Sequence, residues 1–293
     1  MKRVLNVLAV LLLLLVGYFC LWPVPIEPVP FTSGELPPYV GDHAVNTRLA
    51  GLQHISIGDD EGPEHLAFGR DGKLYAAVLS GNILRMNADG SAREVFANTG
   101  GRVLGFDFDA SGNLIAADSI KGLLLIGADR KVSLLTDRVG GANGAGALEA
   151  PVAESTRLIR YADAVVVARN GKIYFTDAST RFSPALWGGT FESSVLDLLE
   201  QSATGRVLEY DPSTRLTRIV ARGLSFANGI ALSQDETALF VNETGRYRVW
   251  KISVAASDLN VATAKSAEAS VFLDNLPGYP DNLMRGLDGR IWL

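Results

Sequence analysis

One pattern recurs five times along the chain and limits the folds that it can adopt: a short apolar segment, a polar turn and a second short apolar segment. The five copies are HLAFGRDGKLYAAV, GFDFDASGNLIAAD, AVVVARNGKIYFTD, GIALSQDETALFVN and LMRGLDGRIWL. Their turns fall at intervals of 40, 59, 65 and 53 residues, at Asp71, Ser111, Asn170, Asp235 and Asp288. Short apolar runs separated by Gly, Asp and Asn are typical of β-hairpins. We therefore expect the chain from about residue 51 onward to be built from β-strands.

A repeat of about 40 to 50 residues with several short strands in each unit predicts the blades of a β-propeller. The longer intervals require insertions, and one of them is TRFSPALWGGTFESSVLDLLEQSATGR, with a helix-like piece around Val195 to Gln201. A β-sandwich is the structural alternative, but it does not explain a recurring turn motif. Residues 51–293 are therefore predicted to form one all-β propeller domain.

The N-terminus has the composition of a membrane anchor. Lys2 and Arg3 precede an apolar run that extends to Trp22 and is broken only by Asn6. Such a run is close to the roughly 20 residues that a bilayer requires, and its aromatic end suits an interface better than a signal-peptidase cleavage site. We expect residues 1–22 to be an uncleaved signal anchor, with a cleaved signal peptide as the alternative, and residues 23–50 to be a stiff Pro-rich linker. The positive charges favour a cytoplasmic N-terminus and an extracytoplasmic propeller.

Composition excludes some classes of function. The formal net charge is -5 and the sequence has no run of Lys or Arg, so no nucleic-acid footprint is present. The single cysteine, Cys20, lies in the apolar N-terminus, so the domain has no thiol for a disulfide or a metal site. A metal ion in the domain would need oxygen or histidine ligands.

The repeat also points to a site. Counting seven residues back from each turn gives Glu64, Leu104, Asp163, Asn228 and Asp281, and Asn282 follows directly. Equivalent positions in successive blades face the same place around the central axis, so these oxygen-bearing side chains are expected to meet at one mouth of the channel. Carboxylate and carboxamide oxygens suit a hard cation such as Ca²⁺ better than Zn²⁺. The structural alternative is that they cap strand ends and satisfy loop backbone groups.

Several segments resemble the strictosidine synthase-like branch of the gluconolactonase and paraoxonase superfamily, the branch that includes adipocyte plasma membrane-associated proteins. They are GPEHLAF, GRVLGFDFDASGNLIAAD, YFTDASTRFS, DLLEQSATGRVLEYDPSTRLTRIV, FANGIALSQDETALFVNETGRYRVWKI and DNLPGYPDN. The resemblance implies a six-bladed propeller with a divalent cation, usually calcium, in the channel, and hydrolysis of lactones or aryl esters. It implies Glu64, Asn228, Asp281 and Asn282 as metal ligands. The family's usual Asn-Asp pair is replaced by Asp163-Ala164, which adds a negative charge to the site.

The expected mechanism is metal-assisted ester hydrolysis of a small-molecule lactone or ester, in which the cation polarises the carbonyl and a carboxylate assists the attacking water. Asp281 is our first candidate for the general base and Asp163 the second. Two alternatives remain: a non-catalytic propeller in which calcium is structural and the rim binds a partner, and the amine–aldehyde condensation of strictosidine synthase. The condensation depends on a glutamate late in the chain of the plant enzyme, and we find no matching segment in this sequence.

Other candidates are weaker. His65 could be a proton shuttle, although the residue after an inward-pointing side chain faces the other way on a strand. His43 and His54 are expected at the surface, and Asp118 and Asp177 could line the entrance or serve as turn residues. Four apolar residues of the insertion could cover the channel as a lid or pack on the rim: Trp187, Phe191, Leu196 and Leu199.

The sequence ends at Leu293 in what reads as the middle of a strand. A four-stranded blade would continue for two more strands, and a six-bladed ring needs one further blade. We therefore expect either that this sequence is part of a longer protein or that it leaves an exposed sheet edge.

Overall fold

The computed structural model describes residues 2–35, 38–141, 157–286 and 288–293. In it, the repeated turns close the first hairpin of successive antiparallel sheets. The carboxylate of Asp71 accepts the backbone N–H of Lys73 at 3.1 Å, and Gly72 between them has a positive φ. The same arrangement recurs at Asn170 and Asp288. Because a short polar side chain can bond to the backbone two residues later and glycine tolerates a left-handed φ, these residue types specify the turn.

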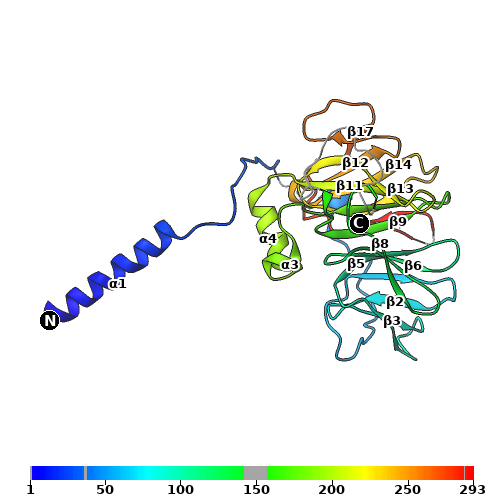
Figure 1. Ribbon diagram of the computed structural model, residues 1–293, viewed down its shortest axis with the longest axis horizontal. Coiled ribbons are helices and arrows are strands. Elements are labelled where there is room, and N and C mark those ends of the chain that lie inside the picture. Colours follow the sequence, from blue (N-terminus) through cyan, green and yellow to red (C-terminus); the bar gives the residue numbers. More distant parts are fainter. Residues whose placement is uncertain (1, 36–37, 142–156, 287) are drawn as a thin grey trace.

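Four sheets follow one another along the chain (Figure 1). The strands of blade 1 are β1 (His65–Phe68), β2 (Leu74–Ala77), β3 (Asn82–Met86) and β4 (Glu94–Asn98). Those of blade 2 are β5 (Val103–Phe108), β6 (Leu114–Asp118), β7 (Gly122–Ile126) and β8 (Val132–Thr136). Blade 3 contains β9 (Ala162–Val167), β10 (Ile173–Asp177), β11 (Gly205–Asp211) and β12 (Leu216–Leu224), with β16 (Leu259–Asn260) parallel to β12 at its edge. Blade 4 contains β13 (Ala227–Leu232), β14 (Ala238–Glu243), β15 (Arg248–Ser253) and β17 (Ala269–Leu273).

The fifth repeat forms a two-stranded sheet, β18 (Met284–Arg285) and β19 (Ile291–Trp292). The innermost strands of the blades contact one another in chain order: β1 with β5, β5 with β9, β9 with β13 and β13 with β18. These strands line a cavity of about 1030 Å³. The predicted fold class is therefore confirmed: an all-β propeller of the six-bladed type, with five repeats visible and the last one incomplete within the described residues.

The core lies between blades. One apolar cluster joins blades 1 and 2 through side chains such as Phe106, a second joins blades 2 and 3 through Phe175 and Leu208, and a third joins blades 3 and 4 through Val207 and Ile252. All five of these side chains are almost fully buried. Blades 2 and 3 each have a neighbour on both faces, so β6 and β10 are buried throughout and read as mostly apolar runs, whereas β1 of blade 1 alternates between partly buried and exposed residues.

The predicted insertion lies between β10 and β11. It forms the short helix α3 (Pro184–Trp187) and the helix α4 (Thr190–Glu200), which begins earlier than the helix-like piece expected from the sequence. Two single turns of 3-10 helix also occur, η1 (Gly41–His43) and η2 (Thr244–Arg246). Helix α4 contacts η2, so the insertion spans from blade 3 toward blade 4.

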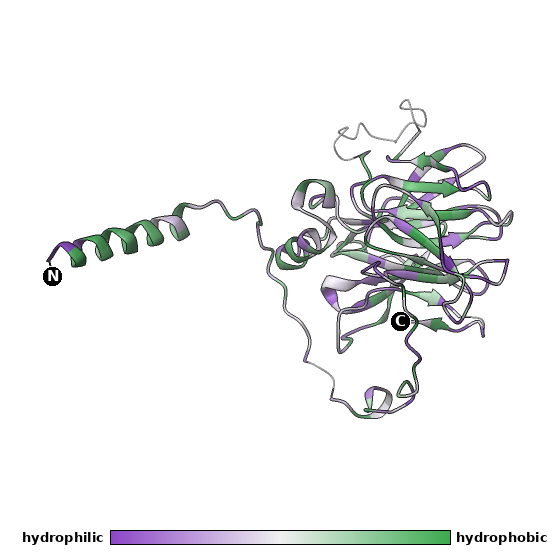
Figure 2. Cartoon of the chain, turned by 90° about the horizontal axis from the view of Figure 1, so that it is seen from below, coloured by the Kyte–Doolittle hydropathy of each residue, from purple (hydrophilic) through white to green (hydrophobic). Residues whose placement is uncertain are grey.

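The N-terminal segment forms one apolar helix, α1 (Lys2–Leu21), which projects away from the propeller on the side of α3 and α4 (Figure 1). Its residues are hydrophobic almost throughout (Figure 2), and it is long and apolar enough to cross a membrane. The predicted apolar N-terminal helix is confirmed. The finer boundaries at residues 22, 23, 50 and 51 stay predictions.

Candidate functional site

The predicted site residues lie at or just before the start of inner strands. Glu64 directly precedes β1, Asp163 is the second residue of β9, Asn228 is the second residue of β13, and Asp281 and Asn282 lie just before β18. These strands surround one channel and begin at the same end of it. The five residues therefore gather at that end, which we call the channel mouth.

Hydrogen bonds connect these residues across blades. Nδ2 of Asn228 donates to Oδ1 of Asp281 at 2.6 Å, and Nδ2 of Asn282 donates to the backbone carbonyl of Glu64 at 3.2 Å. The backbone carbonyl of Asp281 also accepts Nδ2 of Asn242 at 2.7 Å. The segment before β18 is thus held between blade 4 and blade 1, and the carboxylate of Asp281 has a defined position.

Three carboxyl groups at the mouth have raised pKa values. Burial, followed by the negative charges of Asp281 and Glu64, raises the pKa of Asp163 well above its usual value. Burial, followed by the charge of Asp281, also raises the pKa of Glu64, while Arg102 and Asn282 lower it. Asp281 is exposed, yet desolvation by the surrounding protein raises the pKa of its carboxyl, while the hydrogen bond from Asn228 lowers it. The mouth therefore concentrates negative charge that a cation would stabilise.

The donor atoms fit a hard cation. Oδ1 of Asn228 is buried and has no hydrogen-bond partner among the described residues. A buried amide oxygen without a partner costs free energy unless something else satisfies it. No three carboxylate, imidazole or thiolate groups in the described part of the chain could hold a metal ion by themselves, so the candidate site depends on the amide oxygens of Asn228 and Asn282. Oxygen-only donors of this kind match calcium best.

Arg102 is a charged residue of the mouth that the sequence reasoning missed. Its Nη2 lies 3.0 Å from Oε2 of Glu64, and its Nη1 donates to the carbonyl of Gly62 at 3.0 Å. The guanidinium is only 10% exposed. The offset from the turn selects Leu104, and Arg102 lies two residues earlier, the spacing that places side chains on the same face of an extended chain. A search for cations as well as oxygens at that spacing would have found it.

The rim of the mouth has an apolar part. Leu104 packs with Tyr161, Ala178 and Phe226, and Leu198 of α4 lies against this cluster. The hydroxyl of Tyr161 donates to the carbonyl of Thr190 at 2.8 Å, which ties the start of α4 to the rim. Burial, followed by the nearby carboxylates of Asp163 and Glu64, raises the pKa of Tyr161, so it stays a neutral hydrogen-bond donor.

His65 lines the cavity between the inner strands and packs edge-on against Phe106, with ring centroids 4.8 Å apart. Burial lowers its pKa to about 4, so the imidazole is neutral near pH 7. A neutral imidazole can accept a proton, and its role as a shuttle stays a prediction. His43 and His54 lie before the propeller and are exposed, as expected.

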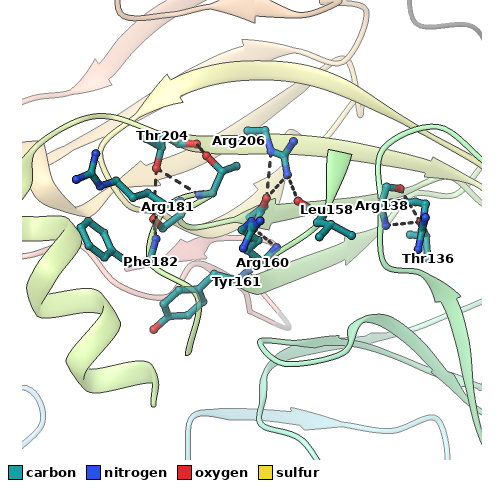
Figure 3. A network of polar contacts seen from close by, with 12 residues as sticks. Thr136, Arg138, Leu158, Arg160, Tyr161, Arg181, Phe182, Thr204 and Arg206 are labelled. Carbon is teal, nitrogen blue, oxygen red and sulfur yellow. Dashed lines mark hydrogen bonds and ion pairs between the residues drawn. The ribbon is translucent and has the colours of Figure 1, made fainter. Parts of the chain in front are cut away.

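Asp118 and Asp177 make the contacts of structural residues. Asp118 is fully buried and accepts hydrogen bonds from the hydroxyl of Thr99 at 2.7 Å and from three backbone N–H groups. Asp177 is also fully buried and pairs with Arg206, which in turn donates to the carbonyl of Leu158 at 2.7 Å (Figure 3). These bonds favour the turn role over a place in the entrance.

The chain is similar to two family models. The strictosidine synthase model matches residues 163–257, and the model for the N-terminal part of strictosidine synthase-like proteins matches residues 41–86. Together these matches include β1, β13 and all but the first residue of β9, with Asp163 and Asn228.

Full-length relatives are similar over most of this chain. Protein STRICTOSIDINE SYNTHASE-LIKE 4 of Arabidopsis thaliana is 34% identical over 275 residues, which cover 92% of this chain and 65% of that protein. Adipocyte plasma membrane-associated protein of Salmo salar is 31% identical over 299 residues, which cover 97% of this chain and 65% of that protein. The chain thus spans slightly less than two thirds of the length of these relatives.

A solved structure has the same fold. A gluconolactonase from Xanthomonas campestris superposes with a TM-score of 0.58 at 22% identity, covering 80% of this chain and 70% of that one. The matched segments and these relatives agree: the chain is similar to strictosidine synthase-like and adipocyte plasma membrane-associated proteins, and it has the fold of a gluconolactonase.

Proposed function

We propose that this protein is a membrane-anchored hydrolase of lactones or aryl esters that uses a divalent cation, calcium by preference, at the channel mouth. The observation that carries the proposal is the donor set: three carboxyl groups with raised pKa and the unpartnered buried oxygen of Asn228 in one place. Glu64, Asp163, Asn228, Asp281 and Asn282 would hold the cation. The gluconolactonase-like fold is consistent with lactones as substrates.

A bound cation would polarise the substrate carbonyl and stabilise the charge that develops on its oxygen. Asp281 is best placed to move the proton because it is open to the mouth and its position is held by Asn228. Its carboxylate would accept a proton from water as the new C–O bond forms, and return that proton to the leaving alkoxide as the ester C–O bond breaks. A raised pKa makes it a stronger base.

Asp163 is the second candidate for the base, and its burial makes it the weaker one. Its side chain is 4% exposed, so water reaches it less readily than it reaches Asp281. The charge of Asp163 would serve mainly to hold the cation. Tyr161 and Leu104 form the apolar rim, which would exclude bulk water from the reacting carbonyl.

The membrane topology is part of the same proposal. α1 is the anchor, and Lys2 and Arg3 at its start favour a cytoplasmic N-terminus. The propeller would then lie outside the cytoplasm, where calcium is abundant enough to fill a site of moderate affinity.

The test is a hydrolase screen on the full chain in detergent, with phenyl acetate and gluconolactone as probes, in calcium and after chelation. We expect calcium-dependent turnover that Asp281→Asn lowers by about 10²- to 10⁴-fold, the usual contribution of a general base. Asp258→Asn is the matched control, because Asp258 is an exposed carboxylate paired with Arg222 on the outside of blade 3.

Two results would contradict the proposal. Turnover that is unchanged in Asp281→Asn would remove the assignment of the base. Calcium-dependent thermal stability without turnover of any lactone or aryl ester would instead identify a non-catalytic scaffold with a structural cation.

A further inference from the structure

Helix α4 exposes three apolar side chains to solvent and buries three polar ones, while Leu198 packs on the rim of the mouth. Ser193, Asp197 and Glu200 have no exposed surface. By contrast, Phe191 is 75% exposed and Leu199 60% exposed. A helix on the surface of a soluble domain shows the opposite arrangement.

The exposed residues form one continuous stripe. Phe191, Val195 and Leu199 are four residues apart, so they lie on one side of the helix. Leu186 of the adjoining helix α3 is 70% exposed. We call Leu186, Phe191, Val195 and Leu199 the outer apolar stripe. Of the four residues expected to form a lid or pack on the rim, Phe191 and Leu199 face solvent, Trp187 packs edge-on against Phe182, and Leu196 is partly buried.

Contacts at both ends hold α4 in this orientation. Its start is bonded to Tyr161 at the rim of the mouth, and Gln201 just after its end donates to the carbonyl of Gly245 at 2.8 Å. On the buried side, Oε2 of Glu200 lies 3.0 Å from Nε of Arg181. Turning the apolar side inward would break these bonds, so the stripe is a fixed feature of the surface.

The linker from α1 binds directly to the end of α4. The backbone N–H of Glu27 donates to Oε2 of Glu200 at 3.0 Å, and that of Val29 donates to the carbonyl of Glu200 at 2.7 Å. The guanidinium of Arg246 lies over the ring of Phe31, with Cζ of Arg246 4.8 Å from the ring centroid. The linker is therefore docked on the same edge of the propeller as α4.

This docking limits the distance between α4 and the membrane. α1 ends at Leu21, six residues before Glu27, and six extended residues span at most about 20 Å. Figures 1 and 2 both show α1 leaving the molecule on the side of α3 and α4. A bilayer crossed by α1 would therefore lie close enough for the outer apolar stripe to contact its lipids.

We infer that the outer apolar stripe lies in the lipid interface of the membrane that α1 crosses, so that the channel mouth faces the bilayer. A helix with an apolar side of this kind typically sinks about 5–10 Å into the boundary between headgroups and acyl chains. Because α4 is bonded to Tyr161 beside the mouth, molecules would reach the mouth from the membrane surface. This inference goes beyond the proposed function and does not depend on hydrolase activity.

The test uses the full chain in phosphatidylcholine vesicles. In a Cys20→Ser background, a single cysteine introduced as Leu199→Cys carries an environment-sensitive fluorophore. The matched control is Ser111→Cys, because Ser111 is exposed in the turn after β5, at the opposite end of the blade from the mouth. We expect vesicles with doxyl-labelled lipid to quench the probe at residue 199 by about twofold or more and to leave the probe at residue 111 almost unchanged.

A second variant keeps the result interpretable. Adding Phe191→Asp to Leu199→Cys should reduce the quenching, while flotation with vesicles stays intact because α1 still anchors the chain. Equal exposure of both probes to water in floated protein would overturn the inference, and so would equal quenching of both. A probe at residue 199 that is shielded from water but not quenched by lipid would show that a protein surface covers the stripe, which also contradicts it.

Discussion

Replacing Arg102 with Met removes the positive charge that pairs with Glu64 at the channel mouth. Its guanidinium is 10% exposed and lies 3.0 Å from the carboxylate of Glu64, which is 29% exposed. It also donates to the carbonyl of Gly62. The variant leaves Glu64 beside Asp281 and removes the guanidinium that lowers the pKa of Glu64 in the cation-free protein.

The cost depends on whether a cation is bound. Removing one partner of a buried ion pair costs about 3–5 kcal/mol, and the partial exposure of Glu64 places Arg102→Met near the lower end, about 3 kcal/mol. When calcium fills the site, Glu64 has another positive partner, and only the hydrogen bond to Gly62 is lost, about 1 kcal/mol. The difference of about 2 kcal/mol predicts that calcium binds the variant roughly 30-fold more tightly than the wild type.

Thermal unfolding followed by tryptophan fluorescence in detergent measures both costs. For a domain of this size 1 kcal/mol corresponds to about 2–4 °C, so we expect Tm to fall by about 6–12 °C in chelator and by about 2–4 °C in saturating calcium. Arg222→Met is the matched control, because Arg222 pairs with Asp258 at 2.7 Å but both side chains are about half exposed. Its loss should stay below about 1 kcal/mol in both conditions. Equal losses for Arg102→Met with and without calcium would refute the reasoning.

The remaining predictions concern pH and the structural carboxylates. Glu64 and Asp163 have folded pKa values above their unfolded values, so their contribution to stability is complete below about pH 4 and is lost as the pH rises through the folded values. In chelator, the free energy of unfolding measured with urea should therefore fall as the pH rises from 4 toward 7. This fall should be less steep in Asp163→Asn than in the wild type, and identical slopes would contradict the prediction. Asp177→Asn breaks the buried pair with Arg206 and should cost about 3–5 kcal/mol by urea unfolding in chelator and in calcium alike; a calcium-dependent loss would place Asp177 in the site.

Much of the fold and of the site could be predicted because each repeat carries its own turn chemistry. The bond from Asp71 to the backbone of Lys73 is local, so the residue types identify the turn without any tertiary information. A fixed count from the turn then reaches the start of the inner strand, where Glu64, Asp163 and Asn228 lie. The count misses Arg102, because it selects Leu104 and Arg102 lies two residues earlier.

The orientation of α4 could not be predicted in the same way. Its buried side is set by contacts with residues far away in the chain: Glu200 with Glu27 and Arg181, and Thr190 with Tyr161. An apolar stripe normally packs inward, so the pattern alone favoured a lid or a packed rim. Only these long-range contacts reveal which side of the helix is free.

The central claim is that the oxygens at the channel mouth bind one divalent cation. Equilibrium dialysis of the full chain against radioactive calcium tests it directly, with a double variant, Asn228→Ala with Asp281→Ala, and Asp258→Asn as the control. We predict one saturable calcium ion per chain in the wild type and in the control, and its loss in the double variant while β-sheet circular dichroism is retained. Calcium binding that is absent from the wild type, or unchanged in the folded double variant, would contradict the claim.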